Sequence, residues 1–281
     1  MKNSKEMCLP FSCEDVDSGA ASLPEEPCNP YYAELFLPRE GRLTVRIEGR
    51  DWVAGPGDAV FCCPGVSRRV IAPAEEPVRF EHLRMDPDRL PGLPDYAPRL
   101  RMILAEASQA GMPMLIPAER VKDLALQKLA DRCLREERER SFGYDLCILS
   151  RLSLICIAVI RFWIGNGLKL SNLTEQEDPI YTLSGYIQTH LRNGLRVEDM
   201  AACCGLSYPW FAKKFREIYG VSCKDFIEQI RVAQVEQYLM YTSLSLTEIS
   251  EMTGYADCSH MIKNFKRIRG ITPGQYRLKQ K

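Results

Sequence analysis

Residues 244–276 read LSLTEISEMTGYADCSHMIKNFKRIRGITPGQY, and this stretch decides the fold of the C-terminal part of the chain. Ser245 and Glu248 have the S-x-x-E spacing of a capping box, in which each side chain bonds the other residue's backbone at a helix start. Gly254 stands where a left-handed residue ends a helix. Asp257 is a good N-cap for the next helix. The stretch therefore predicts two short helices joined by a tight turn.

A second copy of this pattern lies about fifty residues earlier. Residues 195–226 read LRVEDMAACCGLSYPWFAKKFREIYGVSCKDF. The matching apolar and glycine positions are 49 apart before the turn and 50 apart after it: Val197 and Leu246, Met200 and Ile249, Gly205 and Gly254, Phe211 and Met261, Phe215 and Phe265, Gly220 and Gly270, Phe226 and Tyr276. The extra residue falls in a turn, where an insertion costs least. The chain therefore contains a duplicated helix-turn-helix unit.

The second helix of each copy carries basic residues on the side opposite its apolar face. They are Lys213, Lys214 and Arg216 in the first copy and Lys263, Lys266, Arg267 and Arg269 in the second. Any solvated helix shows a charged face, but the same basic face in both copies favours DNA binding. A helix predicted over 224–241 joins the copies. Its length of about 27 Å is near the ~34 Å between successive major-groove faces.

Residues 180–277 resemble the DNA-binding region of the AraC/XylS family of transcriptional regulators. The family's final signature is present as Phe265-Lys266, Gly270, Thr272-Pro273 and Tyr276-Arg277. Two positions depart from the family pattern. His260-Met261 replaces an aromatic pair, and Val235 replaces the usual Ala in the connecting helix.

The resemblance implies which side chains contact DNA. The base-reading positions fall on Pro209, Ala212, Lys213 and Arg216 in the first copy and on Ser259, His260, Lys263 and Asn264 in the second. The two lysines suit guanine, Asn264 suits adenine, and Ala212 suits only a thymine methyl group. The positions expected to contact phosphate are Lys214, Lys266, Arg267 and Arg269.

The N-terminal region is predicted to be a small β-barrel or sandwich over 1–98. Leu43, Val45 and Ile47 alternate with polar residues, and further short strands are expected near 59–63 and 78–85. Gly57-Asp58 followed by Pro64-Gly65 resembles the second half of a cupin barrel motif. The His pair and Glu of metal-binding cupins are missing, so we expect no metal. Arg68 and Arg69 suit either an anionic effector or a solvated surface, and the surface is favoured.

Residues 99–170 are predicted to be a helical dimerisation segment. Val121, Ala125, Leu129 and Cys133 recur every four residues and indicate one helix that ends in the 135–140 charge run. A second helix starts near Tyr144, carries the apolar stripe Leu149, Leu152, Cys156, Val159 and Trp163, and stops at Gly165-Asn166-Gly167. Such an apolar helix packs into its own domain or pairs with another subunit. Residues 171–179 form a linker to the domain at 180–281, which gives an α+β multidomain fold.

The net charge of zero hides two opposite parts. The chain has 37 basic and 37 acidic side chains, but residues 179–281 hold 14 basic and 9 acidic ones. The duplicated unit is therefore basic and the rest of the chain is acidic, which is typical of a nucleic-acid-binding module on an acidic body.

The twelve cysteines and the N-terminus indicate an intracellular protein. No C-x-x-C occurs, only three histidines are present, and no signal peptide is visible. Cys133, Cys147 and Cys156 are expected to be small buried residues. A redox role for Cys62/Cys63 or Cys203/Cys204 is the alternative. The apolar stretch 152–160 is too short for a membrane span, so we expect a cytoplasmic protein without a membrane contact.

These features predict a sequence-specific transcription regulator and not an enzyme. We expect an activator that binds promoter DNA as a homodimer, contacts RNA polymerase, responds to a small-molecule effector and needs no cofactor. The alternative is a DNA-repair alkyl-transfer protein, or another enzyme, that uses the same DNA-binding module. A response regulator is a third option, although no phospho-acceptor domain is visible.

Overall fold

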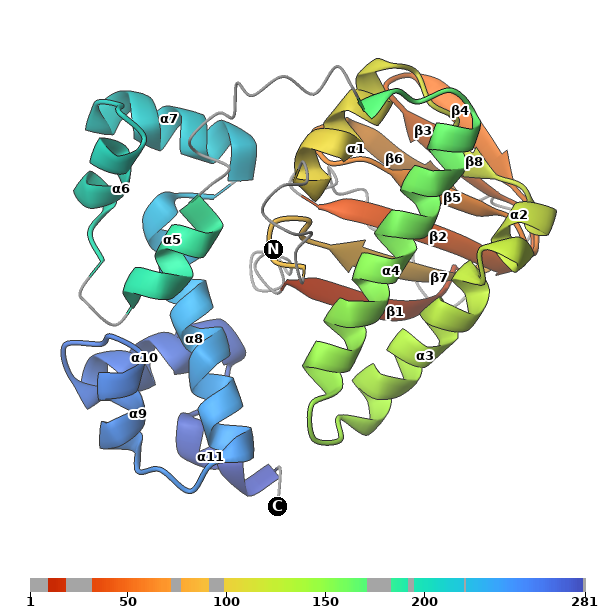
Figure 1. Cartoon of the computed structure of the whole chain (residues 1–281). Helices are drawn as coiled ribbons and strands as arrows, with labels where there is room; N and C mark the ends of the chain where they lie inside the picture. The colour runs from red at the N-terminus through yellow and green to blue at the C-terminus, as the bar shows by residue number, and fades with distance from the viewer. Residues whose placement is uncertain are drawn as a thin grey trace. The chain divides into compact units, whose positions relative to one another are not determined.

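The computed structural model describes residues 10–18, 32–71, 77–90, 99–170, 183–191, 195–219 and 221–279. The chain folds into two compact units (Figure 1). One unit comprises residues 10–175, and the other comprises 176–281 together with 1–9. The predicted linker over 171–179 lies outside the described residues. The contacts do not separate the predicted barrel from the predicted helical segment, because both belong to the first unit.

The first unit contains two antiparallel sheets. The larger has the strand order β1-β7-β2-β5-β8 and the smaller has the order β4-β3-β6. The strands are β1 Phe11–Asp17, β2 Ala33–Glu40, β3 Leu43–Ile47, β4 Arg50–Ala54, β5 Ala59–Cys62, β6 Arg68–Ile71, β7 Arg79–Met85 and β8 Leu115–Ile116. The small β domain is confirmed. The strand β1 was not among the individual strands expected from the sequence, although Phe11 and Cys13 show the same buried alternation as β3.

Four helices complete the first unit: α1 Leu100–Gln109, α2 Ala118–Asp123, α3 Leu126–Glu139 and α4 Tyr144–Gly165. The prediction of one helix through Val121 and Cys133 is wrong. The chain breaks at Ala125, which has a left-handed φ of 54°. Asp58 accepts a hydrogen bond from the Ala118 backbone and fixes the start of α2. Arg39 pairs with Asp131 and fixes α3 on the strands. These tertiary bonds hold α2 and α3 in different directions.

The long apolar helix α4 packs on its own sheet (Figure 1). The ring of Trp163 meets Phe61 of β5 edge-on, with 5.6 Å between centroids, and Cys156 Sγ lies 3.4 Å from Met85 Sδ of β7. By length and composition alone, α4 is long and apolar enough to cross a membrane. Its buried face is instead part of the core of this unit. The turn before the helix and its outer face keep exposed apolar side chains at Phe142, Leu146, Leu154 and Ile164.

The second unit is all-helical among the residues described. Its helices are α5 Leu183–His190, α6 Val197–Cys203, α7 Tyr208–Tyr219, α8 Cys223–Tyr241, α9 Leu246–Met252, α10 Cys258–Arg269 and α11 Pro273–Lys279. The connecting helix α8 carries buried Val232, Val235 and Leu239, which pack with Met261 and Phe265. Val235 and Met261 are fully buried. The core therefore accommodates Val235 and Met261, two of the residues that depart from the family pattern.

The local signals at the helix ends are confirmed. Gly205 and Gly254 have left-handed φ values of 65° and 73°. The Ser245–Glu248 capping box is complete, with the Ser245 backbone donating to Glu248 Oε2 at 2.7 Å. Asp257 accepts from the His260 backbone at 2.7 Å and caps α10. The predicted pair of helix-turn-helix units is therefore α6–α7 and α9–α10.

Candidate nucleic-acid interface

The second helices of the two units, α7 and α10, pack against α8 through aromatic and aliphatic side chains. In α7, Phe211 and Phe215 are fully buried, and Phe215 meets Phe226 of α8 edge-on at 5.5 Å. In α10, Met261 and Phe265 are fully buried in the cluster that contains Val232 and Val235. Each helix therefore has one face fixed in the core and leaves the opposite face to solvent.

Most of the DNA contacts that were predicted for α7 lie on its solvent-exposed face. Pro209, Lys213 and Arg216 are exposed, while Ala212 and Lys214 are half-buried. The spacing of four and three residues puts Pro209, Lys213 and Arg216 on one side of the helix. Lys213 Nζ lies 3.9 Å from Glu217 Oε1, but its side chain is 72% exposed. An exposed pair of this kind contributes little, so Lys213 is free to reorient.

The free face of α10 is more strongly basic. Ser259, His260 and Lys263 are exposed, as are Lys266 and Arg267 on the following turn. The start of this helix is set by the Asp257 cap. The backbone N–H groups of such a first turn favour negative charge. The exposed part of α10 can therefore donate hydrogen bonds to both base edges and phosphates.

Two predicted contacts of α10 are corrected by the structure. Asn264 is buried, and its Nδ2 donates to Glu228 Oε2 of α8 at 2.6 Å. Arg269 donates to both carboxylate oxygens of Glu236, at 2.5 and 2.6 Å, with only 16% of its side chain exposed. Both side chains face the connecting helix instead of solvent. Asn264 therefore does not lie on the exposed face where base readers were expected, and the charge of Arg269 is already paired.

Two exposed aromatic residues were missed by the sequence analysis. Tyr208 is 50% exposed and Trp210 is 54% exposed, both in the first turn of α7. The signal was present in the sequence, because Phe211 and Phe215 already account for the apolar stripe of this helix. Large aromatic side chains left over from such a stripe indicate a contact surface.

Burial disfavours the thiolate form of several cysteines. Burial raises the pKa of Cys63 and Cys223 above the ordinary range, and raises that of Cys156 to about 12. The expectation that Cys147 is buried is wrong, because it lies on the outer side of α4. In the described part of the chain, no three His, Cys, Asp or Glu side chains are close enough to hold a metal ion.

Arg68 does not lie on the surface, contrary to expectation. Its guanidinium is buried and bonds Glu34, with 2.7 Å between Nη2 and Oε1, and this contact joins β6 of the smaller sheet to β2 of the larger. Burial alone would raise the pKa of Glu34, but Arg68 and His82 hold it well below its usual range. Arg69 is exposed as expected. Arg68 is thus a buried link between the sheets.

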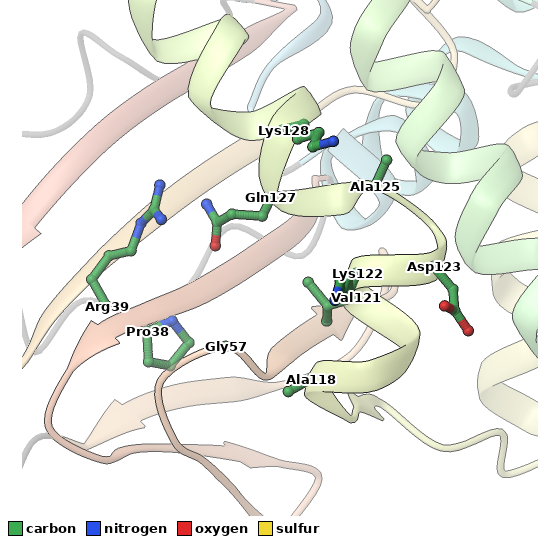
Figure 2. Close-up of a pocket in the computed structure, with 10 residues that line it drawn as sticks. All are labelled: Pro38, Arg39, Gly57, Ala118, Val121, Lys122, Asp123, Ala125, Gln127 and Lys128. Carbon is green, nitrogen blue, oxygen red and sulfur yellow. The ribbon is translucent and has the colours of Figure 1, made fainter.

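A cavity of about 640 Å³ lies between β2 and the α2–α3 turn in the first unit (Figure 2). Figure 2 shows the Gln127 amide pointing toward the Arg39 guanidinium, with Ala118 and Val121 near Pro38 and Gly57. Arg39 pairs with Glu81 and Asp131. The lining residues are Pro38, Arg39, Gly57, Ala118, Val121, Lys122, Asp123, Ala125, Gln127 and Lys128.

Comparisons with known proteins match both units. Residues 200–279 match a helix-turn-helix domain family, and residues 13–84 match a cupin domain family. The xylose operon regulatory protein of Escherichia coli is 30% identical over 92 residues, which cover 33% of this chain and 24% of that protein. The regulatory protein PocR of Salmonella typhimurium is 29% identical over 92 residues, which cover 33% of this chain and 30% of that protein.

The likeness to curated relatives is confined to part of their length. The chain spans between 14% and 30% of the relatives it matches. Among solved structures, the DNA-binding domain of AdpA in complex with a target DNA is 25% identical and covers 37% of this chain and 93% of that chain, with a TM-score of 0.36. Together with the duplicated unit on α8, the two family models identify the domains: residues 13–84 form a cupin domain, and residues 200–279 form a helix-turn-helix domain of the AraC type.

Proposed function

We propose that the chain is a cytoplasmic, sequence-specific transcription regulator that reads promoter DNA with α7 and α10 and acts as an activator through RNA polymerase. One observation carries this proposal. Two helix-turn-helix units pack on one connecting helix, and each keeps an exposed basic face on its second helix. The α8 helix has 19 residues and is about 28 Å long. This length suits two readers in successive major grooves of one duplex.

The test measures affinity as a function of salt for the DNA upstream of the chain's own and adjacent genes, with a random duplex as competitor. The proposal expects a preference for one upstream duplex that persists when salt weakens phosphate contacts. It also expects the specific affinity to fall when Lys213 and Lys263 are replaced by Ala. Equal affinity for all duplexes at every salt concentration would overturn the proposal.

The alternative of an alkyl-transfer enzyme is disfavoured for the buried cysteines Cys63, Cys156 and Cys223. Such chemistry needs a thiolate acceptor, whose pKa must be low. Burial instead raises the pKa of Cys63, Cys156 and Cys223. We therefore propose a non-enzymatic regulator, and an alkyl-transfer assay with a methylated duplex is expected to show no transfer.

The proposed homodimer uses the outer side of α4. Leu146 is 62% exposed and Leu154 is 56% exposed, and they lie two helical turns apart. Exposed apolar side chains grouped in this way indicate a protein contact. Leu146→Glu with Leu154→Glu is expected to convert a dimer to a monomer in sedimentation equilibrium. Val53→Glu, which changes an exposed apolar residue on β4, is the control and should leave the dimer intact. A monomeric unmodified chain at micromolar concentration would contradict this part of the proposal.

The proposed effector site is the cavity between β2 and the α2–α3 turn. Its volume lies in the range of small-molecule sites, and it combines apolar Val121 and Pro38 with polar Arg39 and Gln127. A small polar metabolite suits this lining. A metabolite screen by thermal shift is expected to give a ligand that raises the melting temperature of the chain. Gln127→Leu should abolish that shift, and an unchanged shift in this variant would place the ligand elsewhere.

A further inference from the structure

A chain of three polar side chains links the connecting helix to the reading helix α10. Glu228 of α8 and Asn264 of α10 are buried, whereas His260, one turn before Asn264, is exposed. Asn264 Nδ2 lies 2.6 Å from Glu228 Oε2 and 3.0 Å from His260 Nε2. The same amide nitrogen therefore contacts a carboxylate on one side and an imidazole on the other.

The carboxylate fixes the orientation of the Asn264 amide. An ionised carboxylate only accepts hydrogen bonds, and Arg231 Nη1 keeps Glu228 paired at 3.1 Å. A flipped amide would place its oxygen against Glu228, so that two acceptors would face each other. The NH2 group therefore faces Glu228, and its second hydrogen is available to His260 Nε2. That nitrogen must then accept, which leaves the proton of a neutral imidazole on Nδ1.

Tyr255 and Asp257 also lie beside His260. The Tyr255 ring lies edge-on at 5.5 Å, and burial raises the pKa of its phenol, so Tyr255 is neutral. Asp257 accepts from the His260 backbone at the start of α10. The titratable and charged groups around His260 are Glu228 and Arg231 of α8, Tyr255 and Asp257 of the turn, and Lys263 and Arg267 of α10.

We propose that Glu228 and Asn264 are positioning residues that hold His260 as the neutral Nδ1–H form, so that α10 presents a directed N–H donor to a base in the major groove. The inference rests on the proposed function, since it assigns a base contact to α10. The matching acceptors are guanine N7 or O6, adenine N7 and thymine O4. A proton added to Nε2 would meet the Asn264 N–H, so acid removes the contact that orients the ring.

The first test needs no DNA. Nitrogen NMR of the full chain with labelled histidine resolves three imidazoles, and the signal lost in His260→Asn identifies His260. The expected result at pH 8 is a single Nδ1–H form. Glu228→Gln is expected to raise the Nε2–H population, because an amide partner no longer fixes Asn264. Glu236→Gln on the same helix, which disturbs the Arg269 pair, is the matched control and should leave His260 unchanged. An Nε2–H form in the unmodified chain would overturn the inference.

The second test uses a preferred duplex and a random duplex from pH 8 to pH 5.5. The ratio of the two affinities is expected to fall about fivefold to tenfold as the pH passes through the His260 midpoint measured by NMR. This change corresponds to the lower part of the range for the loss of one base contact. His260→Asn should remove this pH dependence. A ratio that changes equally in His260→Asn would overturn the reading role of His260. Absence of any duplex preference, together with the expected NMR result, would instead overturn the proposed function.

Discussion

The two helix-turn-helix units both pack on α8 but differ in how they are tied to this connecting helix. The first unit has no side-chain cap at Arg196, and α7 packs on α8 through Phe215 and Phe226. The second unit begins with the Ser245–Glu248 capping box. Its reading helix also has polar links to α8, through Asn264–Glu228 and Arg269–Glu236.

The exposed faces of the two reading helices differ in a corresponding way. The start of α7 presents Tyr208 and Trp210, and Glu217 offsets part of its basic charge. The same part of α10 presents Ser259 and His260 and is followed by Lys263, without an acid on the helix. The duplication therefore preserved the apolar positions while the solvent faces diverged. We infer that the first unit reads DNA with more apolar contact and the second with more hydrogen bonding.

The largest expected effect tests the buried aromatic ring in the core of each helix-turn-helix unit. Phe215→Ala and Phe265→Ala each remove a fully buried ring. Each is expected to lower the free energy of unfolding by about 3–5 kcal/mol, because a cavity remains. Urea unfolding of the full chain, followed by circular dichroism, measures the change. Phe142→Ala, at a residue 88% exposed, is the control and should stay within about 0.5 kcal/mol. A small effect at only one of the two buried rings would show that the cores are not equivalent.

The next effect tests base reading in each unit. Lys213→Ala and Lys263→Ala are each expected to weaken binding to the preferred duplex by about 1–3 kcal/mol, with little change on random DNA. Fluorescence anisotropy with both duplexes measures the difference. Lys169→Ala, at an exposed lysine of the first unit that does not line the cavity, should change neither affinity. Equal losses on both duplexes would instead place a lysine on phosphate.

The third effect exploits the difference in capping. Ser245→Ala is expected to lower the free energy of unfolding by about 1 kcal/mol, since the Ser245 hydroxyl accepts from the Glu248 backbone. Arg196→Ser should raise it by about 0.5–1 kcal/mol, because α6 lacks a side-chain cap. Urea unfolding measures both. If Arg196→Ser leaves the free energy of unfolding unchanged, other groups already accept hydrogen bonds from the first backbone N–H groups of α6.

The smallest effect is the pH dependence of the capping box. The hydrogen bond from the Ser245 backbone lowers the pKa of Glu248 in the folded chain. The stabilisation from this hydrogen bond is therefore present when the pH is above the ordinary glutamate pKa. It is lost as the pH falls through the lower pKa that Glu248 has in the folded chain. The unmodified chain should be slightly more stable than Glu248→Gln at pH 7, and the difference should disappear once the pH falls below the lowered pKa of Glu248. A difference that grows toward low pH would contradict the assigned direction.

Features set by neighbouring residues could be predicted from the sequence. The capping box, the left-handed Gly205 and Gly254 and the Asp257 cap all depend on residues within one turn. The spacing of the apolar residues also predicted the buried faces of α7 and α10. These features were sufficient to define the duplicated unit and most of its exposed basic positions.

Features set by distant residues could not be predicted in this way. Asn264 lies three residues after Met261 and four before Ile268, at the edge of the apolar face, but its partner Glu228 is 36 positions away. Arg68 is likewise buried by Glu34, 34 positions away. Ala125 continues a helical period and still breaks it, because Asp58 and Arg39 fix the flanking helices separately. In each case the deciding partner is supplied by the fold.

The central claim is that both helix-turn-helix units of one chain read sequence together. Selection of preferred duplexes from a randomised pool with the full chain, followed by sequencing, tests it most directly. The account predicts two enriched sequence blocks whose centres lie about one helical turn, or ~10 base pairs, apart. Lys213→Ala should erase one block and Lys263→Ala the other. A single enriched block, or enrichment that neither variant changes, would contradict the account.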